Sequence, residues 1–320
     1  MKKIITSDSL KYYWNKNVSE LVNMENIKLE EGRKERHKLY SLLLMSIIYY
    51  YWNGLKEGRN GTYPLNPLNV DPKESPYTQN DYLGHNIAAI AVDRFGSVID
   101  FDFNHNKIFS SSAEHAEMRA VKRIYSLSQI NDSWEMGTNP KREYLEFSSV
   151  SLYTSLESCA QCSGVMTLAN VKEVIYLQSD PGQYLIGNIM RNLSKQGAKY
   201  FAPRPISGQD FQFEYFKNLN DAYVDFYNET PVIFIDENMR ERKSRSITSF
   251  LCTETAYRVY EEAKKEFERL TALTQKLKYP EYKPNGLDED NKMKTNEDVL
   301  EEVKDFYQYA VRNGRRGTAH

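Results

Sequence analysis

The fold is decided by one stretch of the sequence, SVSLYTSLESCAQCSGVMTLANVKEVIYLQS, which covers residues 149–179. Its opening part, SVSLYTS, is predicted to form a strand, and its closing part, EVIYLQS, is an apolar run typical of a fully buried strand. Between them, CAQCSGVMTLANV is predicted to be a helix. A strand, a helix and a second strand in succession are the unit of a layered α/β fold.

Segments on both sides extend this pattern. Upstream, two short β-branched and aromatic runs flank DRFG at residues 93–96, which is a β-hairpin signal, and a helix is expected to begin near Ser112. Downstream, a helix over residues 184–196 leads to a short apolar piece at residues 200–202. Because that helix can return the chain to the same edge of the sheet, the last two strands are expected to be parallel. The sequence thus predicts an α/β fold with a five-stranded mixed sheet, an antiparallel first pair, and helices on both faces.

The rest of the chain is expected to form additions to this layered domain. The apolar run LYSLLLMSIIYYYW at residues 39–52 is interpreted as a buried helix. An aromatic stretch and a possible strand, PVIFID, precede two helices near residues 255–277 and 296–312. The expected division is a helical N-terminal region over 1–80, the layered domain over 81–205, and an aromatic-rich, helical C-terminal region over 206–320.

The composition is that of an ordinary globular protein, with 27% charged and 40% hydrophobic residues. The formal net charge of −2 argues against a surface that is basic throughout, although it allows a local basic patch. The start, MKKIITSDSLKYYW, lacks the apolar core of a secretion signal. The most hydrophobic run, residues 39–52, is shorter than the roughly 20 residues of a membrane span. We therefore expect a cytoplasmic protein without membrane contact.

Two short motifs have the residue types and spacing of a catalytic zinc site. HAE contains His115 and Glu117, and CAQC contains Cys159 and Cys162. The histidine and the two cysteines supply three ligands for a tetrahedral ion and leave the fourth position open for water. The sequence has no second C-x-x-C and no paired histidines to complete a structural site of four ligands.

Glu117 is expected to act on the water rather than to bind the metal. Zinc lowers the pKa of a bound water to about 7, and a nearby carboxylate can carry its proton to a leaving group. Two alternatives stay open: a purely structural zinc, or a chance pair of solvated His and Glu beside a redox C-x-x-C. The strand and helix context around both motifs favours the catalytic site.

These motifs resemble the cytidine/tRNA-adenosine deaminase superfamily of zinc-dependent nucleobase deaminases, whose signature pairs H-x-E with P-C-x-x-C. Within it, HAEM, LYTSLESCAQC, VIY and DPG are most similar to the tRNA adenosine and guanine deaminase branch. The resemblance covers residues 84–202, about a third of the chain. It implies the three-layer α-β-α deaminase fold, in which an antiparallel final strand pair would instead indicate the cytidine deaminase branch.

The resemblance also implies roles for residues near the zinc site. Asn104 stands where the branch has a substrate-contacting asparagine, and Ala116 and Ser155 are further candidates for contacts with the base. Ser158 replaces the usual proline before the first cysteine and is expected to serve as a helix N-cap. An insertion at residues 130–147 is expected to reshape the rim of the pocket.

The implied reaction is hydrolytic deamination of a nucleobase, with zinc-bound hydroxide as the nucleophile and Glu117 as the proton shuttle. The matched branch favours conversion of adenine to hypoxanthine in RNA or another polynucleotide. One alternative is a deaminase of a free base, nucleoside or nucleotide of the guanine or cytosine type. A second is a non-catalytic binding protein in which zinc only stabilises the fold.

The expected cofactor is Zn2+, and the expected partner is a nucleobase-containing substrate such as RNA, with a homodimer left open. Basic side chains on two helices form a candidate phosphate-facing patch, although a solvated helix face is the simpler interpretation. The patch would comprise Arg119, Lys122, Arg123, Arg191, Lys195, Lys199 and Arg204.

Overall fold

The computed structural model describes residues 7–11, 16–52, 85–106, 109–135, 147–194, 201–228, 232–235, 241–285 and 292–313. The main sheet consists of β1 (Ala88–Val92), β2 (Val98–Phe103), β3 (Ser151–Thr154), β4 (Glu173–Tyr176) and β5 (Arg204–Ser207). A separate two-stranded sheet consists of β6 (Val232–Ile235) and β7 (Glu241–Ser244). The helices of the described residues are α1 (Ser7–Lys11), α2 (Val18–Leu21), α3 (Glu31–Tyr50), α4 (Ala116–Glu135), α5 (Ala160–Leu168), α6 (Ile186–Ser194), α7 (Glu214–Asn228), α8 (Ile247–Phe250), α9 (Glu254–Thr271) and α10 (Asn296–Asn313).

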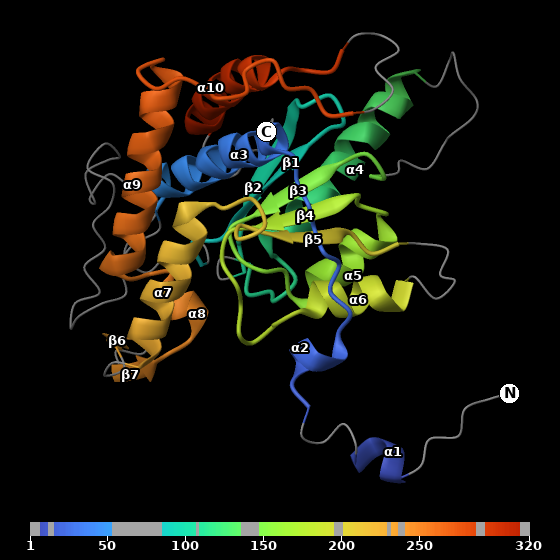
Figure 1. Cartoon of the computed structure of the whole chain (residues 1–320), viewed down its shortest axis with the longest axis vertical. Helices are drawn as coiled ribbons and strands as arrows, with labels where there is room; N and C mark the ends of the chain where they lie inside the picture. Colours follow the sequence, from blue (N-terminus) through green and yellow to red (C-terminus); the bar gives the residue numbers. More distant parts are fainter. Residues whose placement is uncertain are drawn as a thin grey trace, which may run out of the picture.

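The main sheet has the strand order β2-β1-β3-β4-β5 (Figure 1). Strand β1 is antiparallel to β2 and β3, whereas β3, β4 and β5 are parallel to one another. The predicted five-stranded mixed sheet, with an antiparallel first pair and a parallel last pair, is confirmed. These directions also mean that β2, β3, β4 and β5 all end at the same edge of the sheet, which we call the carboxyl edge.

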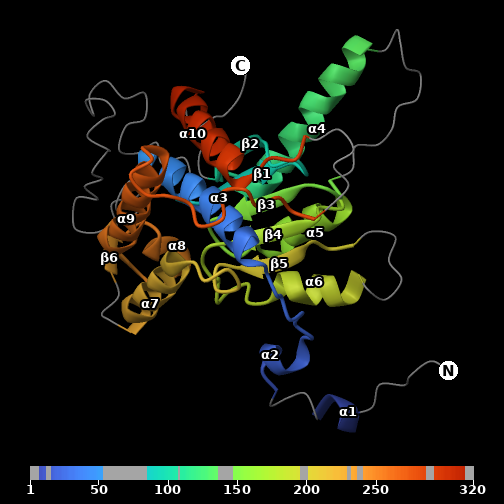
Figure 2. The ribbon, with the colours of Figure 1, turned by 45° about the horizontal axis from the view of Figure 1, so that its top comes forward.

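Helices cover both faces of the sheet (Figures 1 and 2). Helices α4, α5 and α6 lie on one face, where α4 packs against β1 and β2. Helix α3 lies on the other face against β1 and β3, and α9 and α10 cover α3 in turn. The α-β-α layers expected from the sequence are therefore present, with further helices outside α3.

One apolar cluster connects the sheet to the outer helices. It contains Leu42 of α3, Ile90 of β1, Tyr260 of α9 and Val299 of α10, all of which are fully buried. Burial of apolar surface is the main favourable term in folding, so the helices outside the sheet contribute to the same core as the sheet itself.

The last strand of the main sheet is displaced from its expected position. The strand is Arg204–Ser207, whereas residues 201–202 are outside it and residue 200 lies outside the described residues. It includes Pro205, which lacks a backbone N–H and is tolerated because β5 is an edge strand. The possible strand PVIFID contains β6, which pairs with β7 and does not extend the main sheet.

Helix α4 begins at Ala116 and not near Ser112 as expected. The reason is a contact from the residue directly after β2, because Asn104 Oδ1 accepts a hydrogen bond from the backbone N–H of Ala116 at 2.8 Å. This bond satisfies a donor of the first turn, as an N-cap side chain would. Of the expected insertion, residues 130–135 continue α4, and residues 136–146 lie outside the described residues.

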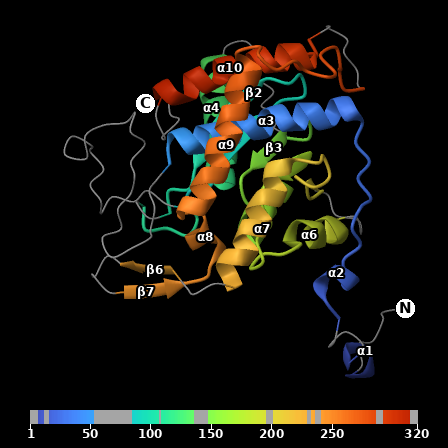
Figure 3. The same ribbon diagram turned by 60° about the vertical axis from the view of Figure 1, so that its left-hand side comes forward.

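The N-terminal helices α1 and α2 lie apart from the layers (Figure 3). The segment after α2 is tied to α6, because Asn23 and Asn192 exchange hydrogen bonds of 2.9 and 2.8 Å. Among the helices of the described residues, none has the length and apolar character needed to cross a membrane.

Candidate active site

The two motifs of the expected zinc site meet at the carboxyl edge of the sheet. His115 ends the segment that follows β2 and directly precedes α4. Cys159 is the N-cap of α5, and Cys162 lies in the first turn of that helix, shortly after β3. These residues come together because β2 and β3 flank β1 and run in the same direction.

The three ligand atoms have the separations that a tetrahedral zinc ion requires. His115 Nδ1 lies 3.4 Å from Cys159 Sγ and 3.5 Å from Cys162 Sγ, and the two sulfur atoms are 3.6 Å apart. A zinc ion at about 2.3 Å from sulfur and about 2.0–2.1 Å from nitrogen gives edges of roughly 3.8 Å between sulfurs and roughly 3.6 Å between sulfur and nitrogen. The residues therefore fit the ion to within about 0.2 Å on each edge. Within the part of the chain that the structure describes, no other group of three His, Cys, Asp or Glu side chains meets in this way.

The start of α5 favours negative charge on Cys159. Its sulfur accepts a hydrogen bond from the backbone N–H of Cys162 at 3.5 Å. The Cys162 thiol, and after it the His115 ring, lower the pKa of Cys159 to about 4. A thiolate is the form in which cysteine binds zinc.

Glu117 lies buried in the first turn of α4, beside the ligand cluster. Its Oε2 is 3.5 Å from Cys162 Sγ, and its Oε1 accepts a hydrogen bond from the Ser158 hydroxyl at 2.9 Å. Burial raises the pKa of Glu117. The expected N-cap role of Ser158 is wrong, because Cys159 caps α5 and the serine hydroxyl instead binds Glu117.

The three residues expected to contact the substrate lie around the same edge. Asn104 is buried just after β2, and its Oδ1 binds the backbone N–H of Ala116. Ser155 is buried just after β3, and its hydroxyl accepts a hydrogen bond from the backbone N–H of Ala88 at 3.1 Å. The side chains of Asn104 and Ser155 thus bind backbone N–H groups at the edge of the sheet where the metal cluster lies. Substrate contacts by Asn104, Ala116 and Ser155 stay a prediction.

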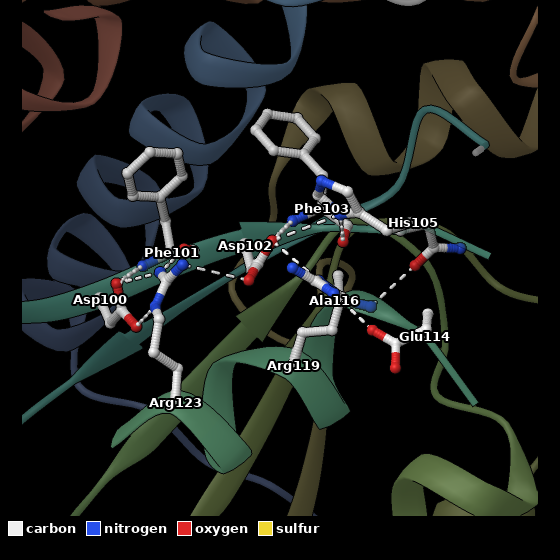
Figure 4. Close-up of polar contacts among 10 residues, drawn as sticks. Asp100, Phe101, Asp102, Phe103, His105, Glu114, Ala116, Arg119 and Arg123 are labelled. Atoms are coloured by element: carbon white, nitrogen blue, oxygen red, sulfur yellow. Dashed lines mark hydrogen bonds and ion pairs between the residues drawn. The ribbon is translucent and has the colours of Figure 1, made fainter. Parts of the chain in front are cut away.

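A buried polar network fixes α4 to β2 (Figure 4). Asp102 forms ion pairs with Arg119 Nε and Arg123 Nη1, both at 3.2 Å, and Asp100 pairs with Arg123. Burial raises the pKa of Asp102 to about 6. Because Arg119 lies one turn after the histidine ligand, the network sets where the first turns of α4 lie relative to α5.

The described arginines of the expected phosphate-facing patch bind other parts of the protein. Arg119 and Arg123 belong to the network above, whereas Arg191 and Arg204 pair with Glu25 at 3.4 and 3.0 Å. Lys195 and Lys199 of the patch lie outside the described residues. These arginines therefore anchor helices and strands to one another.

Sequence reasoning missed Glu157, which holds the segment after β4. Its buried carboxylate accepts hydrogen bonds from the backbone N–H groups of Asp180 at 3.2 Å and Leu185 at 2.9 Å. Gln183 Oε1 from the same segment accepts the backbone N–H of Ala160 at 3.1 Å. The available signal was a carboxylate just ahead of the first cysteine, in SLESC.

The sequence matches a family with this type of site. Residues 72–178 match the family described as the cytidine and deoxycytidylate deaminase zinc-binding region. The match contains His115, Glu117, Cys159 and Cys162, and it ends shortly after β4. No curated protein matches the sequence.

Solved structures with distant likeness include three enzymes. One comes from work on A-to-I editing by tRNA:A34 deaminases, with 22% identity, a TM-score of 0.30, and 38% of this chain and 82% of that chain covered. A guanine deaminase from Nitrosomonas europaea has 20% identity and a TM-score of 0.29, covering 41% of this chain and 71% of that one. A diaminohydroxyphosphoribosylaminopyrimidine deaminase/reductase from Thermotoga maritima has 18% identity and a TM-score of 0.33, covering 61% of this chain and 43% of that one. Likenesses this distant do not indicate a substrate.

Proposed function

Because residues 72–178 match the cytidine and deoxycytidylate deaminase zinc-binding region, we propose that this protein is a zinc-dependent enzyme that hydrolytically deaminates a nucleobase. One observation carries the proposal: a buried carboxylate lies 3.5 Å from a cysteine of the three-atom zinc cluster. A structural zinc site has no use for such a carboxylate, whereas a hydrolytic site needs a group that moves protons.

His115, Cys159 and Cys162 would hold the ion, and their separations fit it. When bound, zinc supplies a Lewis acid that makes water available as a nucleophile near neutral pH. Glu117 would take a proton from that water and deliver protons to the ring nitrogen and to the departing amine. The products are then ammonia and the base with oxygen in place of the amino group.

The substrate class we propose is adenine within RNA or another polynucleotide, converted to hypoxanthine. The segments HAEM and LYTSLESCAQC support it through their similarity to the tRNA adenosine branch. The parallel pair β4 and β5 is compatible with that branch. Asn104, Ala116 and Ser155 would contact the base in this proposal.

A deaminase of a free base, nucleoside or nucleotide is the second candidate. It is favoured by the ion pairs of Arg119, Arg123 and Arg191, which leave these guanidinium groups engaged within the protein. A polynucleotide substrate would gain affinity from cationic side chains on its phosphates, so a substrate without a long phosphate backbone has less need of them.

The test is mass spectrometry of candidate substrates after incubation with zinc-loaded protein. The panel includes single-stranded RNA and DNA, and free bases, nucleosides and nucleotides of adenine, guanine and cytosine. Deamination adds roughly 1 Da, because oxygen replaces the amine. The Glu117→Gln protein serves as the control that should produce no shift. Stoichiometric zinc with no mass change in any substrate would overturn the proposal and favour a zinc-stabilised binding protein.

A further inference from the structure

Two exposed aromatic side chains lie on segments that are pinned beside the metal ligands. Phe109 lies between β2 and α4, and Tyr184 lies between β4 and α6. Phe109 is 57% exposed and Tyr184 is 46% exposed, so neither ring contributes much to the core. Both segments follow strands that end at the carboxyl edge, where the zinc ligands meet.

The Phe109 ring is supported from within the protein. The backbone N–H of His105 binds the carbonyl of Glu114 at 2.9 Å, which closes the segment directly beside His115. The Phe109 N–H binds the His105 carbonyl at 3.2 Å, and the Arg119 guanidinium carbon lies 5.4 Å from the centre of the Phe109 ring. Arg119 is itself held by Glu114 and by the network in Figure 4. The ring therefore rests on a fixed cation while much of its surface faces solvent.

The Tyr184 segment is held just as firmly. Glu157 binds the backbone N–H groups of Asp180 and Leu185, on either side of Tyr184. Gln183 binds the backbone N–H of Ala160, the residue directly after the Cys159 ligand. The two rings thus belong to separate segments, each attached next to one part of the metal cluster.

The strand order places these segments on opposite sides of the site. Phe109 follows β2 and Tyr184 follows β4, and the order β2-β1-β3-β4 puts β3, which leads to Cys159, between them. Three strand spacings separate β2 from β4, a distance of about 14 Å. The two segments therefore leave the sheet at strand ends that are farther apart than the width of one base.

We propose that Phe109 and Tyr184 form an aromatic rim on which the bases flanking the target base stack, so that the substrate is a single-stranded nucleic acid. This inference rests on the proposed deaminase function and specifies its substrate class. Base stacking on aromatic rings tolerates any sequence and adds affinity that does not come from the phosphates, which suits a protein whose described arginines at this end are engaged in ion pairs.

The test measures binding of a fluorescein-labelled short single-stranded RNA of mixed sequence to the zinc-loaded full chain. Phe109→Ala and Tyr184→Ala should each raise Kd roughly five- to 100-fold, whereas the two tryptophan substitutions should keep the affinity. Phe201→Ala is the matched control, because Phe201 is 49% exposed but lies before β5, at the opposite edge of the sheet. Its Kd should equal that of the wild type. Circular dichroism should show that all variants are folded.

Turnover on the same RNA and on the free nucleoside separates this inference from the proposed function. The alanine variants should lose turnover on RNA through a higher KM and keep turnover on the nucleoside. Unchanged RNA affinity in both alanine variants would contradict the proposed aromatic rim. If the wild type deaminates a free base or nucleoside and binds no RNA, the inference fails while the reaction stands. If it binds RNA through these rings and releases no ammonia from any substrate, the reaction fails while the rim stands.

Discussion

Glu117 accepts a hydrogen bond from Ser158 and lies 3.5 Å from Cys162 Sγ, yet it is not one of the three clustered ligands. At the scale of single residues, this placement separates holding the metal from moving protons. Substitutions of Glu117 and of Ser158 test these two roles.

Replacing Glu117 by Gln keeps an oxygen for Ser158 and removes the group that carries protons. We expect zinc content and Tm to stay near wild type, while turnover falls by about 10²–10⁴-fold. Metal analysis and an ammonia-release assay measure the two quantities on one sample. Loss of zinc would show that Glu117 is a ligand, and full turnover would show that another group moves the proton.

Replacing Ser158 by Ala removes the hydrogen bond that orients the Glu117 carboxylate. Hydrogen bonds to charged groups contribute about 1.5–3 kcal/mol, so kcat should fall by roughly tenfold or more, with zinc content unchanged. Ser163→Ala is the control, because Ser163 on α5 is a buried serine like Ser158, but its hydroxyl donates to the Ser158 carbonyl at 3.5 Å and not to the carboxylate. Equal kcat values for the two variants would contradict an orienting role for Ser158.

At this scale, the residues that could be predicted from the sequence are those whose chemistry fixes their spacing. His115, Cys159 and Cys162 follow from what a tetrahedral ion needs, and the structure brings them together. Ser158 and Glu157 could not be assigned, because their partners lie 41 and 28 positions away in the chain. No local sequence pattern indicates a hydrogen bond between residues that are so far apart in the chain.

At the scale of elements, the position of α4 relative to β2 sets the geometry of the site. Asp102 connects β2 to Arg119 and Arg123, and Asp100 connects the same strand to Arg123, one turn further along α4. Buried ion pairs rarely increase stability over apolar residues of similar volume. The pairs are therefore better explained by the register they impose on the helix.

Asp102→Asn should weaken zinc binding on the order of tenfold, as loss of groups that orient ligands generally does. Asp100→Asn is the matched control, since it also removes a buried carboxylate from β2 but leaves Arg119 in place. Competition with a chelator measures zinc affinity, and thermal unfolding measures the cost to stability. Equal loss of zinc affinity in both variants would mean that the network only stabilises the fold.

The layer order of these elements could be predicted, but some of their boundaries could not. The parallel pair β4 and β5 followed from a connecting helix that must return the chain to the same edge. The position of β5 was missed because Pro203 and Pro205 disfavour a strand locally, whereas an edge strand accepts a proline such as Pro205. The start of α4 was missed because its first turn is capped by Asn104, just after β2, and not by the residues directly before the helix.

At the scale of the whole molecule, α9 and α10 share one apolar cluster with α3 and the sheet. The sequence predicted that these helices have apolar faces, but it did not indicate that those faces pack against α3. Since α3 packs directly on β1 and β3, the outer helices support the sheet that carries the site.

Leu270→Ala should lower the free energy of unfolding by about 2–5 kcal/mol, because Leu270 of α9 is buried in this cluster. Leu273→Ala is the control on the same part of the chain, where the side chain is 75% exposed and the change should stay within about 0.5 kcal/mol. Denaturation followed both by circular dichroism and by zinc release should give one shared transition. Two separated transitions would show that the outer helices fold independently of the site.

The 3.6 Å between the two ligand sulfurs has an electrochemical consequence. Metal-free protein presents two adjacent thiols, one of them partly exposed, which dissolved oxygen can oxidise to a disulfide with loss of two electrons and two protons. Cys252 is fully buried and should not take part. Chelated protein kept in air should therefore lose two thiols in an Ellman titration and rebind zinc only after reduction, whereas zinc-loaded protein should keep all three cysteines reduced. Equally fast loss of thiols from a zinc-loaded sample would contradict protection of the cysteines by zinc. If zinc does protect them, a preparation with low zinc content is one whose ligand cysteines have been oxidised.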